Sequence, residues 1–125
     1  MMNTYLPVLK IAARTATTTS DDIDNRYARG VLVTLDVTAL TVGASITLSI
    51  EAKDIVSGKY EALLTASTAV TATGTHSYLV YPGAGAASDD IVQTASFPLP
   101  RIWRVKVTHA DNTSVTYSVG ANLIL

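Results

Sequence analysis

Few residues in this chain are of the types that carry out catalytic or metal chemistry. There are two histidines, His76 and His109, and no cysteine. The histidines are not spaced to share one metal ion, and no Gly-x-Ser-x-Gly motif marks a nucleophilic serine. The lack of cysteine excludes disulfides, thiolate metal sites and cysteine nucleophiles. We therefore expect both histidines to be structural, either hydrogen-bonded or facing solvent.

One acidic segment brings together the oxygen ligands that calcium prefers. Asp21, Asp22, Asp24 and Asn25 lie close together in the sequence. The segment lacks the glycine and the distal glutamate of an EF-hand loop, so we favour a solvated acidic turn. A hydrolase that pairs these carboxylates with a histidine as general base is an alternative. The sequence predicts that the protein is not an enzyme and has no metal and no cofactor.

The aromatic residues raise a second alternative, a glycan-binding or adhesion module, because sugars stack on exposed aromatic rings. Trp103 and Tyr117 alternate in phase with valines, so we expect both in the core. Four other tyrosines could form a platform: Tyr5, Tyr27, Tyr78 and Tyr81. We favour packing and partner contact for them, since tyrosines in strands commonly pack with their hydroxyls in water.

These side chains must be positioned by β-strands, because apolar and polar residues alternate along much of the chain. The alternation is strongest at 30–37, 45–53, 103–108 and 115–119, and weaker at 5–11, 59–65 and 75–81. Turn-forming residues separate these runs. Seven short strands at this spacing predict an all-β fold, a single antiparallel β-sandwich that is immunoglobulin-like or jelly-roll-like, with little helix.

A chain of 125 residues is expected to form one domain, residues 1–125. Within it, residues 1–28 are predicted to form an N-terminal strand or arm followed by a polar loop at 15–27. Residues 29–125 are predicted to form the body of the sandwich. The arm or the loop could add a strand to the edge of a neighbouring molecule. The stretch 82–100 contains glycine, alanine and proline and is predicted to be a long connection.

The charge of the chain is low and balanced. Nine basic and ten acidic residues give a net charge of -1, and 15% of residues are charged, against about 25% in ordinary soluble domains. A nucleic-acid ligand is not expected without a basic excess. Few charges leave less protection against association. Two interpretations stay open: a threonine-rich β-domain, or a surface covered by neighbouring subunits.

No targeting or membrane segment is expected. The first residues lack the basic and apolar regions of a signal peptide, and no apolar run approaches the ~20 residues of a membrane helix. We therefore predict that the protein is made in the cytoplasm and has no membrane partner.

Four stretches resemble a group of small virion proteins of tailed bacteriophages and prophages: Glu51–Tyr60, Tyr81–Gly83, Leu99–Asp111 and Tyr117–Asn122. The strand that begins at Trp103 also resembles the penultimate strand of fibronectin type III and immunoglobulin-like domains. The phage resemblance implies a structural protein of the virion, such as a decoration or cement protein on the capsid exterior. Head-completion or tail proteins are alternatives within the same class.

The same resemblance implies protein partners. These would be the major capsid protein or other virion proteins, bound by a homo-oligomer or a lattice subunit after synthesis in the host cytoplasm. The group has no assigned catalytic residues, so none are carried over to this chain. We predict that partner contacts are made by seven residues: Tyr5, Leu6, Arg26, Tyr27, Phe97, Leu99 and Arg101.

Overall fold

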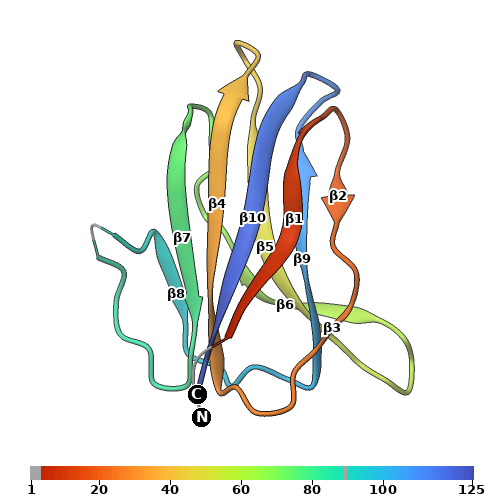
Figure 1. The fold of residues 1–125 in the computed structure, drawn as a ribbon, viewed down its shortest axis with the longest axis vertical. Coiled ribbons are helices and arrows are strands. Elements are labelled where there is room, and N and C mark those ends of the chain that lie inside the picture. Colours follow the sequence, from red (N-terminus) through yellow and green to blue (C-terminus); the bar gives the residue numbers. More distant parts are fainter. Residues whose placement is uncertain (1–3, 89) are drawn as a thin grey trace.

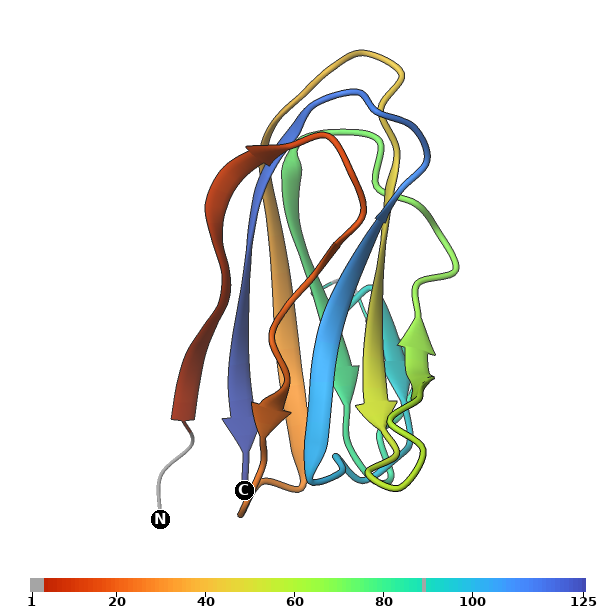
Figure 2. The same ribbon diagram turned by 90° about the vertical axis from the view of Figure 1, so that its right-hand side faces the viewer.

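The computed structural model describes residues 4–88 and 90–125 and shows an all-β protein, with no helix in these ranges. Ten strands form two five-stranded sheets that pack against each other (Figures 1 and 2). Across the first sheet the order is β1 (Thr4–Arg14), β10 (Val115–Ile124), β4 (Gly30–Leu40), β7 (Gly74–Val80) and β8 (Gln93–Ala95). Across the second it is β2 (Thr18–Thr19), β9 (Ile102–His109), β5 (Ile46–Lys53) and β6 (Tyr60–Thr65), and β3 (Ile23–Asp24) also pairs with β9.

The core lies between the sheets and is formed by the alternating apolar residues of the long strands. In β4, Val31, Val33, Leu35 and Val37 are buried, while the residues between them are partly exposed. The central strands of the second sheet contribute a matching set: Ile46, Leu48, Ile50, Trp103, Val105 and Val107. Each such side chain contributes about 1.5–3 kcal/mol when it leaves water, so the alternation itself selects the sheet face that is buried.

The chain pairs its early strands with its late ones. β1 pairs with β10, β2 and β3 pair with β9, and β4 pairs with β7, all in antiparallel orientation. β5 and β6 form the innermost hairpin. The first and last strands are therefore neighbours, and the start of β1 and the end of β10 lie at the same end of the molecule (Figure 1).

Of the two forms predicted for the N-terminal segment, a strand or an arm, the described residues form a strand. β1 is the edge strand of the first sheet and pairs with β10 along its length. The reason is apolar packing, since Leu6, Val8 and Leu9 pack against the core and would be exposed on a free arm. The edge of β1 is also poorly suited to adding a neighbour's strand. It contains Pro7 and two register shifts, and Arg14 donates hydrogen bonds to backbone carbonyls within the strand.

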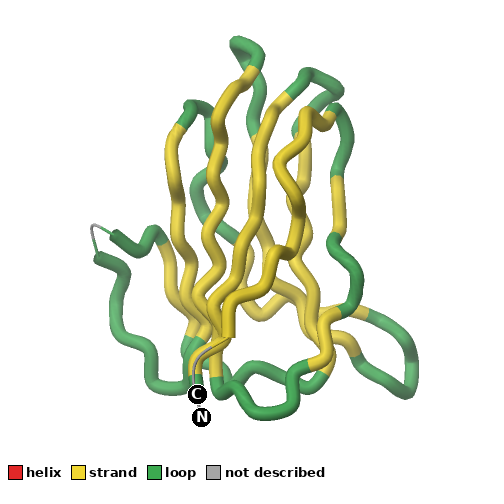
Figure 3. Tube along the Cα trace, viewed as in Figure 1, coloured by secondary structure: helices red, strands yellow, loops and turns green. Residues whose placement is uncertain are grey.

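The predicted loop at 15–27 contains two short strands, β2 and β3, so the count of seven strands is too low. The backbone amide of Ser20 donates to the carbonyl of Val105, and the Ser20 hydroxyl accepts from the Val105 amide. The connection at 82–100 contains β8, which pairs in parallel with β7, so the sheets are not wholly antiparallel. These three elements are short pieces within long loops (Figure 3). Backbone hydrogen bonds hold these elements in place. Such bonds do not require apolar and polar side chains to alternate, so the sequence shows no strand pattern there.

Candidate functional site

An apolar groove lies at the end of the sandwich where β1 begins and β10 ends. Its volume is about 310 Å³. The walls come from Thr4 and Leu6 of β1, from the segment Ile23–Ala28, and from Leu123 and Leu125 near the C-terminal end of the chain. The groove therefore spans the space between β1 on the first sheet and β3 on the second.

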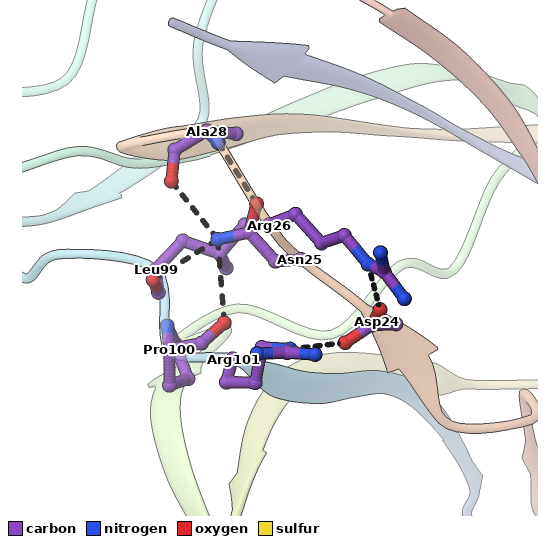
Figure 4. Close-up of polar contacts among 7 residues, drawn as sticks. All are labelled: Asp24, Asn25, Arg26, Ala28, Leu99, Pro100 and Arg101. Carbon is purple, nitrogen blue, oxygen red and sulfur yellow. Dashed lines mark hydrogen bonds and ion pairs between the residues drawn. The ribbon is translucent and has the colours of Figure 1, made fainter.

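Asn25 is the hub that shapes one wall of this groove (Figure 4). Its side chain is 7% exposed. Nδ2 donates to the carbonyl oxygens of Ala28 at 2.9 Å, Leu99 at 3.2 Å and Pro100 at 3.3 Å, while Oδ1 accepts from the amide of Ala28 at 2.9 Å. The backbone amide of Asn25 donates to the carbonyl of Arg101. The buried side-chain amide of Asn25 thus joins the turn after β3 to the segment that leads into β9.

Two arginines share one carboxylate beside this hub. Nε of Arg26 donates to Oδ2 of Asp24 at 2.9 Å, and Nε of Arg101 donates to Oδ1 (Figure 4). These hydrogen bonds, that of Arg101 first, hold the pKa of Asp24 below its usual value. Two guanidinium groups thus share one carboxylate at the rim of the groove. The arginine side chains are 66% and 61% exposed, so their remaining N–H groups are open to a ligand.

The structure brings together four of the seven predicted contact residues. Leu6, Arg26 and Tyr27 line the groove, and Tyr27 is 69% exposed. Arg101 lies beside them through its bond to Asp24. Sequence reasoning placed these residues in separate segments, and only the tertiary structure shows that they adjoin.

The other three predicted contact residues lie elsewhere. Leu99 is buried in the core, so its side chain is not accessible to a partner in this structure. Its backbone pairs with Asn25 and Arg29 instead. Phe97 is half exposed and does not line the groove. Tyr5 is exposed on the outer face of the first sheet, with its ring over Gly120.

The regularly paired rows on the outer face of the first sheet carry little charge, although Lys10, in the irregular stretch of the edge strand β1, is exposed. The residues of this face alternate with the buried ones of β1, β10, β4 and β7, which lie side by side in Figure 1. In the regularly paired rows they are Tyr5, Pro7, Leu32, Thr34, Asp36, Thr75, Ser77, Leu79, Ser118, Gly120 and Asn122. Asp36 is the one ionisable acid or base among them, apart from the tyrosine hydroxyl, and it accepts a hydrogen bond from Thr75. The rest of these rows is hydroxyl, amide or apolar.

Tyr5 lies across the strand next to its own. A Cβ atom built on Gly120 would meet the Tyr5 hydroxyl oxygen at 3.2 Å and its Cε2 at 3.3 Å, so the ring occupies the space that a side chain would take. The ring covers the glycine in the sheet and leaves much of the tyrosine exposed. An exposed aromatic on a low-charge surface is typical of a binding surface.

The outer face of the second sheet is charged by contrast. Nζ of Lys53 lies 2.9 Å from Asp22, whose other oxygen accepts a hydrogen bond from the Tyr60 hydroxyl at 2.6 Å. Arg104 packs over the Tyr60 ring, 3.4 Å from its centre, and pairs with Glu51 at 2.8 Å. The hydrogen bonds from Tyr60 and then Lys53 lower the pKa of Asp22, and the bond to Asp22 raises the pKa of Lys53. Four charged side chains, Asp22, Glu51, Lys53 and Arg104, are therefore held in pairs on this face.

The residues considered for catalysis or metal binding are placed in separate structural roles. His109 Nε2 lies 2.9 Å from the Tyr117 hydroxyl, and burial, followed by the charge of Arg14, lowers the pKa of His109. Nε2 of His76 is buried without a hydrogen-bond partner in the described ranges. Asp22 and Asp24 form the ion pairs given above. Over residues 4–88 and 90–125, no three histidine, aspartate or glutamate side chains gather in a way that could hold a metal ion.

Two features of the structure were not predicted from the sequence. The first is the hub role of Asn25, which depends on carbonyls about 75 residues further along the chain and has no local signal. The second is the turn between β5 and β6, where Ile55 and Val56 are 68% and 96% exposed. Two apolar residues in a polar bend were a signal that could have marked this turn.

No protein-family model matches this chain, and no curated protein sequence matches it. Within the described ranges, no helix is long and apolar enough to cross a membrane.

Proposed function

We propose that this protein is a structural subunit of a tailed-phage virion and not an enzyme. In this role it decorates or cements the capsid lattice from outside, through contacts with the major capsid protein or other virion proteins. The observation that carries the proposal is the low charge of the regularly paired rows on the outer face of the first sheet, together with the paired charges on the outer face of the second sheet. The sequence resemblance supplies the virion setting.

An uncharged face suits a permanent protein contact for an energetic reason. An ionised group that is buried without a partner costs several kcal/mol, whereas hydroxyl and amide groups can exchange water for hydrogen bonds to a partner. Thr34, Ser77 and Ser118 are of this kind, and Tyr5 supplies an aromatic anchor. The second sheet, with its ion pairs, would face solvent and keep the particle soluble.

We further propose that the sandwich is of the jelly-roll type. If β2 and β3 are counted as one interrupted strand and the short β8 is left aside, eight strands remain, with the first paired to the last and the second to the next to last. This nested pairing supports a jelly roll. In an immunoglobulin-like sandwich the last strand lies beside the penultimate one, whereas here β10 lies between β1 and β4. A fold of this type does not by itself assign a function.

A glycan-binding module is the second candidate, and the position of Tyr5 is the observation that favours it. Its ring lies over Gly120 on a hydroxyl-rich face, and Asn122 is the residue opposite Tyr5 on β10. Tyr78 and Tyr117 are buried, so neither can contribute to a platform. A glycan array that returns no ligand for the folded protein would remove this candidate.

The test of the virion role uses purified particles of the phage that encodes the chain. The protein should be present in them, and particles that lack it should bind the purified protein in co-sedimentation. Thr34→Lys places an ammonium in the middle of the uncharged face and should weaken binding at least about 10-fold, because an unpaired charge would be buried. Thr47→Lys on the outer face of the second sheet is the matched control. Absence from particles, or equal binding by both variants, would contradict the proposal.

A further inference from the structure

A small cavity lies between β7 and the loop that joins β6 to β7, and its volume is about 180 Å³. Besides two alanines, it is lined by Thr68, Val70, Thr71, His76, Tyr78 and Val92. Among the described residues, no aspartate, glutamate, lysine or arginine lines it. The cavity therefore combines hydroxyl groups and one imidazole with apolar walls.

Two polar atoms on the β7 side of this cavity have no hydrogen-bond partner in the described ranges. They are the hydroxyl oxygen of Tyr78, whose side chain is fully buried, and the buried Nε2 of His76. A buried polar group without a partner is destabilising and uncommon in folded proteins. The two residues alternate with the outer-face positions of β7 and lie about 7 Å apart along the strand. One ligand can therefore reach both side chains.

The chemistry of the lining favours an uncharged ligand with hydroxyl groups. An ion would find no opposite charge among the lining residues, and burying it unpaired is costly. Burial raises the pKa of Tyr78, so its hydroxyl keeps its proton and can donate. A ligand hydroxyl both donates and accepts, so it can pair with His76 in either tautomer. The volume corresponds to about six non-hydrogen atoms at the ~30 Å³ that a water molecule takes in the liquid.

The backbone around the cavity is fixed, while the side chains at its mouth are exposed. The Val70 amide donates to the Ile46 carbonyl at 2.8 Å and the Ile46 amide donates back at 3.1 Å, and the Val92 amide donates to a carbonyl of β7 at 2.8 Å. Thr68 and Thr71 are exposed, and Val92 is 41% exposed. These side chains can turn aside to admit a ligand, and the preformed backbone lowers the entropy lost on binding.

We propose that this cavity binds a small uncharged polyol. Its hydroxyl groups pair with the Tyr78 hydroxyl and with Nε2 of His76, while its carbon atoms lie against Val70 and Val92. A free polyol and the end of a sugar chain share this chemistry, so the test includes a probe for each. The site goes beyond the proposed attachment to the capsid, because it lies on the inner side of β7 and not on the outer face of the first sheet.

Titration of the full, ¹⁵N-labelled chain with glycerol and with a methyl glucoside tests the site by two-dimensional NMR. At least one of the two should shift the amides of 68–72, 76–78 and 92 and saturate at a Kd of about 1–10 mM, as expected for so small a ligand. A response to glycerol alone identifies a free polyol, and a response to the glucoside alone identifies a sugar. Tyr78→Phe keeps the ring and removes the hydroxyl, so it should weaken binding at least about 10-fold. No binding of either probe, equal binding of acetate, or equal binding by Tyr78→Phe overturns the proposal.

Urea unfolding of the free protein gives an independent readout with a matched control. Tyr78→Phe removes a hydroxyl without a partner, so its urea midpoint should equal or exceed that of the wild type. Tyr117→Phe removes a buried hydroxyl that lies 2.9 Å from Nε2 of His109, so its midpoint should fall. An equal fall in both variants would show that the Tyr78 hydroxyl is already satisfied, and would overturn the proposal. Tyr78→Phe should bind particles as the wild type does, so failure of the virion role and failure of the cavity are separate results.

Discussion

Replacing Asn25 with alanine should destabilise the fold strongly, because this buried side chain joins two segments distant in sequence. Nδ2 carries two hydrogens, so its three contacts amount to about two hydrogen bonds, and Oδ1 accepts one more from Ala28. Each contributes about 1 kcal/mol, and carbonyls left buried without a donor, such as that of Leu99, add to the cost. We expect the free energy of unfolding to fall by about 3 kcal/mol. For a chain of this size the loss corresponds to a drop of about 12 °C in midpoint temperature.

Trp103 provides the assay, since it is the chain's one tryptophan and is fully buried. Its fluorescence should report global unfolding in a urea titration. Asn25→Asp removes the donors and keeps an acceptor, so it should cost at least as much as alanine. Asn122→Ala, at an exposed asparagine on β10, is the control and should change the free energy of unfolding by less than about 0.5 kcal/mol. A loss below about 1 kcal/mol for Asn25→Ala would refute the hub role.

Three further predictions concern pH and close packing. Burial and the charge of Arg14 lower the pKa of His109, so at this position the unfolded chain binds a proton more readily than the folded chain. The urea midpoint should therefore fall as the pH drops from about 7 to 5. His109→Gln should make the urea midpoint depend less on pH. Gly30→Ala would place a Cβ atom 2.3 Å from a backbone carbonyl of β7, so it should cost about 3 kcal/mol or prevent folding, as measured by the same titration. Gly120→Ala meets the flexible Tyr5 side chain at 3.2 Å and should cost less than about 1 kcal/mol; a cost equal to that of Gly30→Ala would contradict the difference between the two sites.

The paired rows of the two sheets differ in charge, so a chain with few ionised residues still presents two different faces. The second sheet holds Glu51, Lys53 and Arg104 in paired networks. The first sheet presents hydroxyl groups in the corresponding outward positions, with Thr34 and Ser77 in contact at 3.2 Å. Composition predicted a low total charge and left open how it is distributed. The distribution depends on which strands share a sheet.

The sequence by itself determined the all-β class and most of the strands, because the alternation of side chains along a strand is a local property. The runs around Val31–Val37, Ile46–Ile50 and Trp103–Val107 needed no partner to be recognised, since each must bury one face. The same reasoning placed Trp103 and Tyr117 in the core, where both are found.

Only the tertiary structure decided how those strands are ordered and where the candidate site lies. β10 lies between β1 and β4, and β2 and β3 join β9, through backbone hydrogen bonds between segments far apart in the chain. Such pairing uses groups that every residue carries, so side-chain patterns do not encode it. The groove, the shared carboxylate of Asp24 and the hub at Asn25 all depend on this long-range arrangement, and for that physical reason none could be derived from spacing alone.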